Sequence, residues 1–246
     1  MKEDVLRTAK DMLRKGLVEG TAGNISARMA DGSICITPSS VDYEAMTLED
    51  ICVIDLDGEQ LEGERGPSSE KLLHTAIYKA YDDVQSVIHS HPVYATMFAI
   101  ARKPIPPCID EFSIYVGGEV PVTEYGQSGT QDVGDNAVAV LADRGAALLA
   151  NHGMVAVGPS PAKALHITAL VERSAQIVWG AMLLGDIHKL PDKVNQDFAN
   201  IYTGWMRTAP RPTRVSGGTN PVGRSGAAPA PRASSAPPAP RRCGRR

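Results

Sequence analysis

The sequence predicts an α/β protein with a largely antiparallel sheet, and three observations carry that prediction. Helical and strand-like segments are mixed along the chain without strict β–α–β alternation, which disfavours a parallel sheet. Asp57-Gly58 lies between two short strand-like runs and is a strong signal for a hairpin turn between antiparallel strands. With 246 residues, of which 43% are hydrophobic, the chain is long enough to bury one sizeable core.

The elements of the N-terminal part follow from their periodicity. The apolar residues of segment 2–17 fall on one face of a helix, and the glycine-rich turn at 20–26 ends it. Ser68-Ser69-Glu70 precedes an amphipathic helix that runs to Ala80, for which we expect a serine cap and an acid in the first turn. Short strand-like runs between these helices predict strands at residues 33–37, 51–56 and 59–61.

The C-terminal part continues the mixture of strands and helices. A strand over 84–91 ends at two histidines, and Pro92 starts a helix that runs through Ile100. A proline-rich loop at 103–107 follows. The remaining apolar patterns predict strands at residues 120–123, 146–150 and 154–157, and helices at residues 132–141 and 161–184.

Two histidines separated by one residue, His89 and His91, end the strand at 84–91. Side chains at positions i and i+2 of a strand point to the same side, so the two imidazoles face one point. His152, beside a glycine that permits a tight turn, can supply a third ligand. Three protein ligands leave the open coordination position that a catalytic metal requires. Such a site fits zinc best, with iron, manganese or cobalt as alternatives, and partly buried, hydrogen-bonded histidines are the competing interpretation.

The charge distribution predicts an acidic folded body followed by a basic tail. Residues 209–246 contain eight arginines and no lysine or acid. Because the whole chain has a net charge of −3, the preceding 208 residues carry about −11 (−3 less +8). The tail is rich in proline, glycine, alanine and serine, so we expect it to be disordered. It has no aromatic residues for base stacking, and we expect no specific nucleic-acid partner.

The composition also indicates a cytoplasmic protein. The chain has no run of about eighteen apolar residues, so no transmembrane helix is expected. Its charged N-terminal segment lacks the hydrophobic core of a signal peptide. The four cysteines have neither CxxC spacing nor the density of a disulfide framework, which favours reduced thiols.

Three polar turns along the chain predict an anion-binding site. Residues 20–24, residues 37–40 and the pair Ser68-Ser69 are rich in glycine or hydroxyl side chains, and their backbone N–H groups can approach a phosphate. Each turn is a weak signal by itself, but three of them in an acidic body indicate local dipoles that hold one phosphate. Glu70, taken alone, is explained as an acid that interacts with the dipole of its helix.

Five segments, taken in their order and spacing, resemble the class II aldolase/adducin family, whose enzymes include L-fuculose-phosphate aldolase. Five ordered motifs are far more specific than any single one, and the resemblance covers roughly residues 2–205. The segments are Gly23-Asn24-Ile25-Ser26, Ile36-Thr37-Pro38-Ser39-Ser40, Ser68-Ser69-Glu70, His89-Ser90-His91-Pro92 and Asn151-His152-Gly153.

The resemblance implies a three-layer α/β/α catalytic domain over residues 1–208, and a homotetramer with active sites between subunits. It implies that His89, His91 and His152 bind one zinc ion per subunit and that Glu70 is the acid/base. The implied reaction splits a ketose phosphate of the fuculose- or ribulose-1-phosphate type into dihydroxyacetone phosphate and an aldehyde, through a metal-stabilised enediolate. The implied phosphate cradle consists of Gly23, Asn24, Ser39, Ser40, Ser68 and Ser69.

The chain departs from the family pattern in the loop before Gly117-Gly118. Fuculose-type aldolases carry a tyrosine there, whereas the matching residue here is Glu111 and Tyr115 is out of register. Glu111 is therefore a candidate second acid/base, against the alternative of a loop carboxylate that pairs with a basic neighbour. In this family, a tyrosine near the C-terminus typically reaches across the subunit interface. Tyr202 is the nearest candidate for that tyrosine. His166, on the long helix, is expected to pack rather than to bind metal.

Two other activities and one non-enzymatic role remain open. Methylthioribulose-1-phosphate dehydratases have a glutamate near the position of Glu111, but they typically lack the carboxylate that matches Glu70. Ribulose-phosphate 4-epimerases use an aspartate where this chain has Ile114. An adducin-like assembly module would lack the metal ligands, so the three histidines and Glu70 argue against that role.

Overall fold

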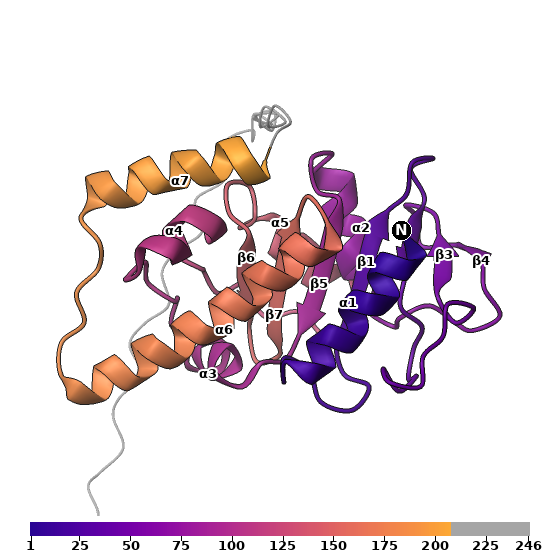
Figure 1. Ribbon diagram of the computed structural model, residues 1–246, viewed down its shortest axis with the longest axis horizontal. Coiled ribbons are helices and arrows are strands. Elements are labelled where there is room, and N and C mark those ends of the chain that lie inside the picture. Colours follow the sequence, from indigo (N-terminus) through magenta and orange to yellow (C-terminus); the bar gives the residue numbers. More distant parts are fainter. Residues whose placement is uncertain (208–246) are drawn as a thin grey trace, which may run out of the picture. The chain divides into compact units, whose positions relative to one another are not determined.

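The computed structural model describes residues 1–207, and these contain one seven-stranded sheet (Figure 1). The strand order is β4-β3-β2-β1-β5-β7-β6, and every neighbouring pair is antiparallel. The predicted antiparallel sheet is therefore confirmed. The strands are β1 (Asn24–Arg28), β2 (Ile34–Ile36), β3 (Cys52–Ile54), β4 (Gln60–Glu62), β5 (Ser86–Ser90), β6 (Ala146–Leu149) and β7 (Gly153–Gly158).

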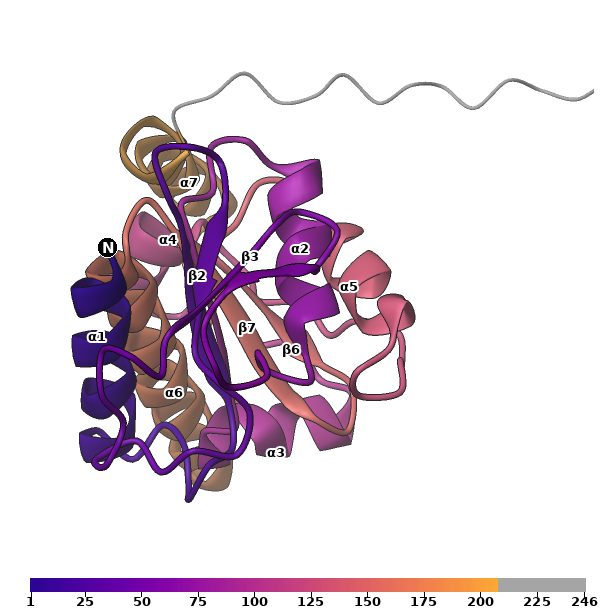
Figure 2. The ribbon, with the colours of Figure 1, turned by 90° about the vertical axis from the view of Figure 1, so that its right-hand side faces the viewer.

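Helices cover both faces of the sheet, which gives the expected α/β/α layers. Figure 2 shows α1 and α6 on one side of the sheet and α2 and α5 on the other. The first side consists of α1 (Lys2–Arg14), α3 (Val93–Ala101) and α6 (Pro161–Leu184), and the second of α2 (Lys71–Ala80) and α5 (Gln131–Val138). Two further helices, α4 (Asp110–Val116) and α7 (Asp192–Met206), pack against each other.

The central strand β5 separates two hydrophobic cores. All five of its residues are buried. Val87 packs into the cluster under α2 and α5, whereas Ile88 packs into the cluster of α1 and α6. His89 follows Val87 by two residues and therefore points to the α2 side of the sheet. The C-terminal end of the central strand thus faces the beginning of α2.

The first turn of α2 differs from the prediction. Glu70 is the N-cap residue, with φ −101° and ψ 19°, and no side chain caps the helix. The expected serine cap with Glu70 inside the first turn is therefore wrong. The hydroxyl of Ser68 instead accepts a hydrogen bond from the backbone N–H of Glu70, at 3.2 Å. Because the N-cap residue has a non-helical backbone, the side chain of Glu70 is free to reach the end of β5.

The predicted strand at 120–123 is also wrong. Val120 makes an isolated bridge with Ile105, and Val122 makes another with Leu148. The two bridges have different partner segments, the first antiparallel and the second parallel, so they do not join into one ladder. Pro121 between them also has no N–H group to donate.

Helices α4 and α7 were not predicted from the sequence. α4 has only seven residues, too few for a clear helical period. α7 does carry a signal, because Phe198, Tyr202 and Met206 are spaced by four residues and the latter two are buried. The predicted basic tail at 209–246 lies outside the described residues.

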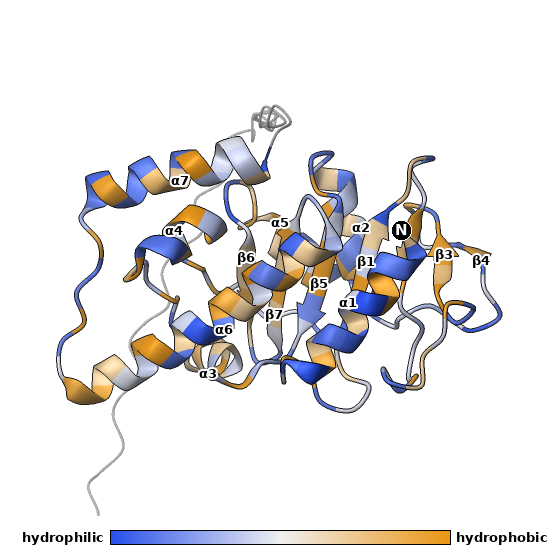
Figure 3. Ribbon diagram, in the orientation of Figure 1, coloured by the Kyte–Doolittle hydropathy of each residue, from blue (hydrophilic) through white to orange (hydrophobic). Residues whose placement is uncertain are grey.

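Within residues 1–207, α6 is the one helix that is long and apolar enough to cross a membrane, judged by length and composition. Its buried side chains, among them Ile167, Val171 and Ala175, belong to the core cluster that it shares with α3 and β7. Figure 3 shows that hydrophobic residues also gather at its C-terminal end, where Leu183 and Leu184 are exposed. The packing of α6 is that of a core helix with an apolar final turn.

An almost fully buried ion pair ties the end of α7 to the segment between α2 and β5. Arg207 and Asp83 form this pair with side chains only 6% and 9% exposed. Arg207 also donates to the carbonyl oxygen of Leu141 at 2.9 Å. Removing the charge of one partner leaves the other charge buried and uncompensated.

Asp83→Asn is therefore expected to lower the free energy of unfolding by about 3 kcal/mol, measured by urea denaturation. Asp82→Asn changes the neighbouring exposed aspartate in the same way and should have almost no effect. Equal stabilities of the two variants would contradict the assigned role of the ion pair.

Candidate functional site

His89 is held by strands on both sides. Its backbone pairs with Asn24 of β1 and with Val155 of β7, and its side chain is fully buried. His89 Nδ1 lies 2.9 Å from the carbonyl oxygen of Met154. A carbonyl oxygen only accepts, so Nδ1 carries the proton and Nε2 keeps a free lone pair.

Three imidazoles converge on one point beyond the end of β5. The ring centroids of His89, His91 and His152 lie 4.6–5.0 Å apart. The Nε2 atoms of His89 and His91 are 2.8 Å apart. The structure therefore brings together the three histidines that the sequence singled out, although His91 lies one residue past the strand itself.

The turn between β6 and β7 delivers His152 to this point. Asn151 adopts a left-handed conformation with φ 55° in this turn. A Cβ atom at Gly153 would lie 2.4 Å from the carbonyl oxygen of Ser90 and 2.6 Å from Cδ2 of His91. Glycine is therefore required for the turn to approach β5 this closely.

Glu70 closes the remaining side of the histidine cluster. Its Oε2 lies 2.8 Å from Nε2 of His89, and its Oε1 lies 3.3 Å from Nε2 of His152. One ligand atom from each of Glu70, His89, His91 and His152 lies within 4.8 Å of the others, so the group could hold one metal ion. Two donors fix the carboxylate: the hydroxyl of Ser128 donates to Oε1 at 2.5 Å, and Nδ2 of Asn24 donates to Oε2 at 3.3 Å.

Burial and hydrogen bonding set the protonation of this cluster. Burial raises the pKa of Glu70, but the close contact with His89, the hydrogen bond from the hydroxyl of Ser128 and the nearby His152 lower it by more, so this pKa lies well below its usual range. Burial lowers the pKa of His91 to about 4 and also lowers the pKa of His152. At neutral pH the carboxylate is ionised and these two imidazoles are neutral, which are the forms that bind a divalent metal.

A pocket of about 200 Å³ opens beside the cluster. Glu70, His91, His152 and Ser128 line one part of it. In the described part of the chain, no lysine or arginine lines this pocket, so an anion there depends on backbone N–H groups, hydroxyls and a neighbouring metal charge. All six residues expected to hold a phosphate line the same pocket: Gly23, Asn24, Ser39, Ser40, Ser68 and Ser69.

Backbone conformation explains why the first turn can run so close to the histidines. Gly23 has φ 76°, and a Cβ atom there would lie 2.8 Å from the carbonyl oxygen of His89. The buried side chain of Tyr43 supports this turn, because its hydroxyl donates to the carbonyl oxygen of Gly23 at 2.7 Å. Ser40, in the second turn, also has a left-handed backbone with φ 57°.

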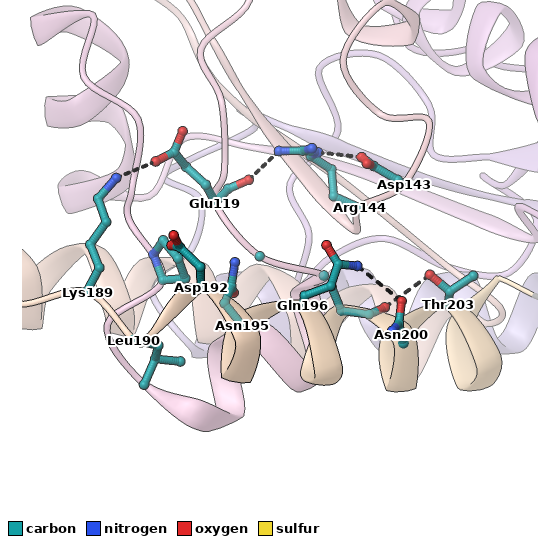
Figure 4. A pocket seen from close by; sticks show the side chains of 14 residues that line it. Glu119, Asp143, Arg144, Lys189, Leu190, Asp192, Asn195, Gln196, Asn200 and Thr203 are labelled. Atoms are coloured by element: carbon teal, nitrogen blue, oxygen red, sulfur yellow. Dashed lines mark hydrogen bonds and ion pairs between the residues drawn. The ribbon is translucent and has the colours of Figure 1, made fainter.

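A second pocket of about 390 Å³ lies between α7 and the loop that follows α4 (Figure 4). Four of its five charged side chains are already paired, Lys189 with Glu119 at 3.1 Å and Arg144 with Asp143 at 2.8 Å, and the fifth is the acid Asp192. It shares no residue with the pocket beside the histidines. Within residues 1–207, the histidine cluster is also the one group of side chains found to be arranged for metal binding, so the candidate site is the first pocket.

Glu111 and Tyr202 do not reach this pocket. Glu111 is exposed on the first turn of α4, and Tyr202 is fully buried in the core beneath α7. Neither lines the pocket in the described chain, and the role of Glu111 as a second acid/base stays a prediction. The burial of Tyr202 argues against the prediction that its side chain reaches across to another subunit.

His166 is exposed and packs edge-on against Tyr115, with ring centroids 5.0 Å apart.

Two contacts of the site were missed by the sequence analysis. His74, one helical turn after Glu70, lies with its Nε2 2.5 Å from Oδ1 of Asn24. The spacing of four residues from Glu70 could have revealed it, because such residues share one face of a helix. Ser128 carries no comparable signal, since the path of its loop depends on tertiary packing.

The fold and the site together define an α/β/α protein in which a cluster that could hold a metal ion lies beside a pocket lined by glycine- and serine-rich turns. Residues 3–179 match the Class II Aldolase and Adducin N-terminal domain. The chain is 32% identical over 205 residues to a 5-deoxy-D-ribulose 1-phosphate aldolase of Bacillus thuringiensis, covering 83% of this chain and 96% of the relative. It is 35% identical over 182 residues to an L-fuculose phosphate aldolase of Escherichia coli, covering 74% of this chain and 84% of that relative.

Solved structures agree with the sequence relatives. One described as L-fuculose 1-phosphate aldolase superposes with a TM-score of 0.79 at 34% identity, covering 82% of this chain and 95% of the other. The chain therefore belongs to the class II aldolase and adducin family. The resemblance noted in the sequence and the fold that it implied are both confirmed.

Gly153→Ala is expected to weaken metal binding about 10- to 100-fold, the usual effect of disturbing a group that orients a ligand. The added Cβ must displace the ring of His91 or the Ser90 carbonyl. Isothermal titration with zinc ions measures the affinity. Gly66→Ala is the matched control, because a Cβ there meets nothing within 4 Å. Unchanged zinc affinity in G153A would mean that this turn does not position a metal ligand.

Proposed function

We propose that the chain is a zinc-dependent aldolase that cleaves a phosphorylated ketose into dihydroxyacetone phosphate and an aldehyde. The observation that carries this proposal is the position of the His89–His91–His152–Glu70 cluster at the wall of a pocket lined by three glycine- and serine-rich turns. The chain is an enzyme of the aldehyde-lyase class, in keeping with its family and with relatives that are named aldolases.

The donor atoms of the cluster fit a catalytic zinc ion. Imidazole nitrogen and carboxylate oxygen are common zinc ligands, and other divalent transition metals accept the same set. His89, His91 and His152 would hold the ion, one per subunit, and the hydrogen bond from His89 Nδ1 to Met154 fixes the tautomer that this requires. When bound, the metal supplies a Lewis acid for the hydroxy-ketone oxygens of the substrate.

Glu70 is the residue that we assign to proton transfer. In the synthetic direction, the carboxylate of Glu70 removes a proton from C3 of dihydroxyacetone phosphate, and the aldehyde oxygen gains a proton as the new bond forms. In the cleavage direction, the C4 hydroxyl group loses its proton as the C3–C4 bond breaks, and Glu70, once protonated, gives a proton to the carbon that becomes C3 of dihydroxyacetone phosphate, so that the protons balance. The donors Ser128 and Asn24 hold one oxygen each, so the carboxylate has a fixed orientation toward the pocket.

The glycine and serine turns hold the phosphate end of the substrate. The hydroxyls of Ser39, Ser40, Ser68 and Ser69 line the pocket together with the turn at Gly23 and Asn24. Binding energy from the phosphate orients the reacting carbons without contacting them. Relatives named for fuculose phosphate and 5-deoxyribulose 1-phosphate support a ketose 1-phosphate of these types as the substrate.

Dehydration of methylthioribulose 1-phosphate and 4-epimerisation of a ribulose phosphate are the competing outcomes. The carboxylate of Glu70 supports cleavage over dehydration, because it is the group that the dehydratase pattern typically lacks. Ile114 stands where the epimerase pattern has an aspartate. The intact ligand cluster favours an enzyme over an adducin-like assembly module.

The proposal includes a homotetramer in the cytoplasm. Leu183 and Leu184 at the end of α6 are 70% and 92% exposed, and apolar surface of this kind supports contact with another subunit. Cys35, Cys52 and Cys108 are free thiols in the described chain, which suits a reducing compartment.

Product analysis with a panel of ketose 1-phosphates and zinc tests the reaction. We expect dihydroxyacetone phosphate and an aldehyde, identified by mass spectrometry. Loss of water from the substrate would instead identify a dehydratase, and inversion of one hydroxyl would identify an epimerase.

Glu70→Gln is expected to slow proton exchange at C3 of dihydroxyacetone phosphate at least about 100-fold, the usual contribution of a general base. NMR in deuterated water follows the exchange, and metal analysis should still find zinc, because three imidazoles remain. Glu64→Gln alters an exposed carboxylate and serves as the control. Wild-type exchange in E70Q would remove Glu70 from the mechanism.

A further inference from the structure

A row of buried polar side chains runs between α2 and β1 and ends at the carboxylate of Glu70. Glu70, His74 and Tyr78 are spaced by four residues and share one side of α2, whereas Asn24 and Ser26 are spaced by two and share one side of β1. Four helical residues rise about 6 Å and two strand residues about 6.6 Å, so the two sets can interdigitate. Each of the five residues is at most 8% exposed.

The contacts alternate between helix and strand along the whole row. Asn24 lies between Glu70 and His74, with Nδ2 3.3 Å from Oε2 and Oδ1 2.5 Å from Nε2. His74 then reaches Ser26, with Nδ1 2.6 Å from Oγ. The same Ser26 Oγ lies 2.9 Å from the hydroxyl of Tyr78. Each link is a hydrogen bond between two side chains, which is the least common kind in proteins.

The ionised carboxylate fixes the direction of every bond in this row. Glu70 can only accept, so Nδ2 of Asn24 donates and its Oδ1 faces His74. That oxygen also only accepts, so Nε2 of His74 carries the proton. Burial lowers the pKa of His74 to about 3, and the neutral ring leaves Nδ1 as an acceptor. Ser26 must therefore donate to His74, and Tyr78 to Ser26.

Arg28 closes the far end of the row. It is the next residue on the same side of β1, and its guanidinium carbon lies 4.9 Å from the ring centroid of Tyr78. Its Nη2 donates to the carbonyl oxygen of Tyr78 at 2.7 Å. The row thus begins beside a cation and ends at an anion, with all its donors pointing toward the anion, so that successive bonds polarise one another.

A buried polar row is a costly way to fill a core, because apolar side chains of similar volume are usually as stable or more so. This row ends at the residue to which we assign proton transfer. We propose that His74 is a positioning residue for that step: through Asn24 it holds Oε2 of Glu70 in one place. The inference rests on the proposed function of Glu70. If the tautomer of His74 reversed, the amide of Asn24 would turn over and present its oxygen to the carboxylate.

Proton exchange of dihydroxyacetone phosphate in deuterated water tests the role of the row. His74→Leu and Ser26→Ala are expected to lower kcat for exchange about 10- to 100-fold, with KM little changed, since orienting partners outside the reacting groups have effects of this size. His74→Gln offers an amide nitrogen near the position of Nε2 and should recover most of the kcat lost in H74L. Equal losses in H74Q and H74L, or wild-type kcat in S26A, would overturn the proposal.

Ser86→Ala is the matched control for S26A. Ser86 is a fully buried serine in the same sheet, and its hydroxyl donates to the carbonyl oxygen of Ser26 at 2.8 Å, outside the row. It should keep wild-type kcat, and a loss equal to that of S26A would mean that any buried hydroxyl here has the same effect.

The tautomer of His74 provides a readout that does not depend on the reaction. Nitrogen NMR of histidine-labelled protein should show His74 protonated at Nε2 and unprotonated at Nδ1, and protonation at Nδ1 would overturn the proposal.

The E70Q variant separates a failure of this inference from a failure of the proposed function. If E70Q retains wild-type exchange, the proposed function of Glu70 is wrong, whatever the effect of the His74 variants. If E70Q is inactive while H74L is not, the role of His74 alone fails.

Discussion

The backbone pairing of His89 with Asn24 on one side and Val155 on the other is the constraint on which the site depends. It fixes the end of the central strand, and with it the direction of the buried imidazole. The neighbouring strand β7 also supplies the Met154 carbonyl that sets the tautomer of His89. Glycines at 23 and 153 then let two turns approach the same strand end. The sheet therefore positions His89 directly, and the chain segments that carry His91, His152 and Glu70 meet at the end of the same strand.

The electrostatics of the site follow from this packing. The described pocket has hydroxyls and turns but no lysine or arginine, so a phosphate there relies on dipoles and on a metal charge next to it. The same burial that lowers the pKa of His91 and His152 keeps their lone pairs available at neutral pH. Glu70 stays ionised because donors surround it. In the proposed function, the metal, the phosphate and the proton carrier are therefore linked parts of one arrangement.

Sequence reasoning found those features that depend on local spacing. The antiparallel sheet, the convergence of His89 with His91 and the three polar turns all follow from periodicity or composition. The N-cap position of Glu70 and the contact with Ser128 depend on how the first turn of α2 meets distant segments, which local pattern does not encode. The strand predicted at residues 120–123 is wrong because Val120 and Val122 pair with two different segments, which local β-propensity does not encode. The family resemblance, rather than geometry, supplied the roles of Glu70 and the phosphate cradle.

X-ray absorption spectroscopy of the zinc-loaded protein tests the central claim most directly, because it reports the atoms that surround the metal. Three imidazole nitrogens at about 2.0–2.1 Å, with oxygen completing the shell, are the predicted result. In a His91→Ala variant the spectrum should lose one imidazole contribution. Sulfur ligands at about 2.3 Å, or a spectrum that is the same in the variant, would contradict the account.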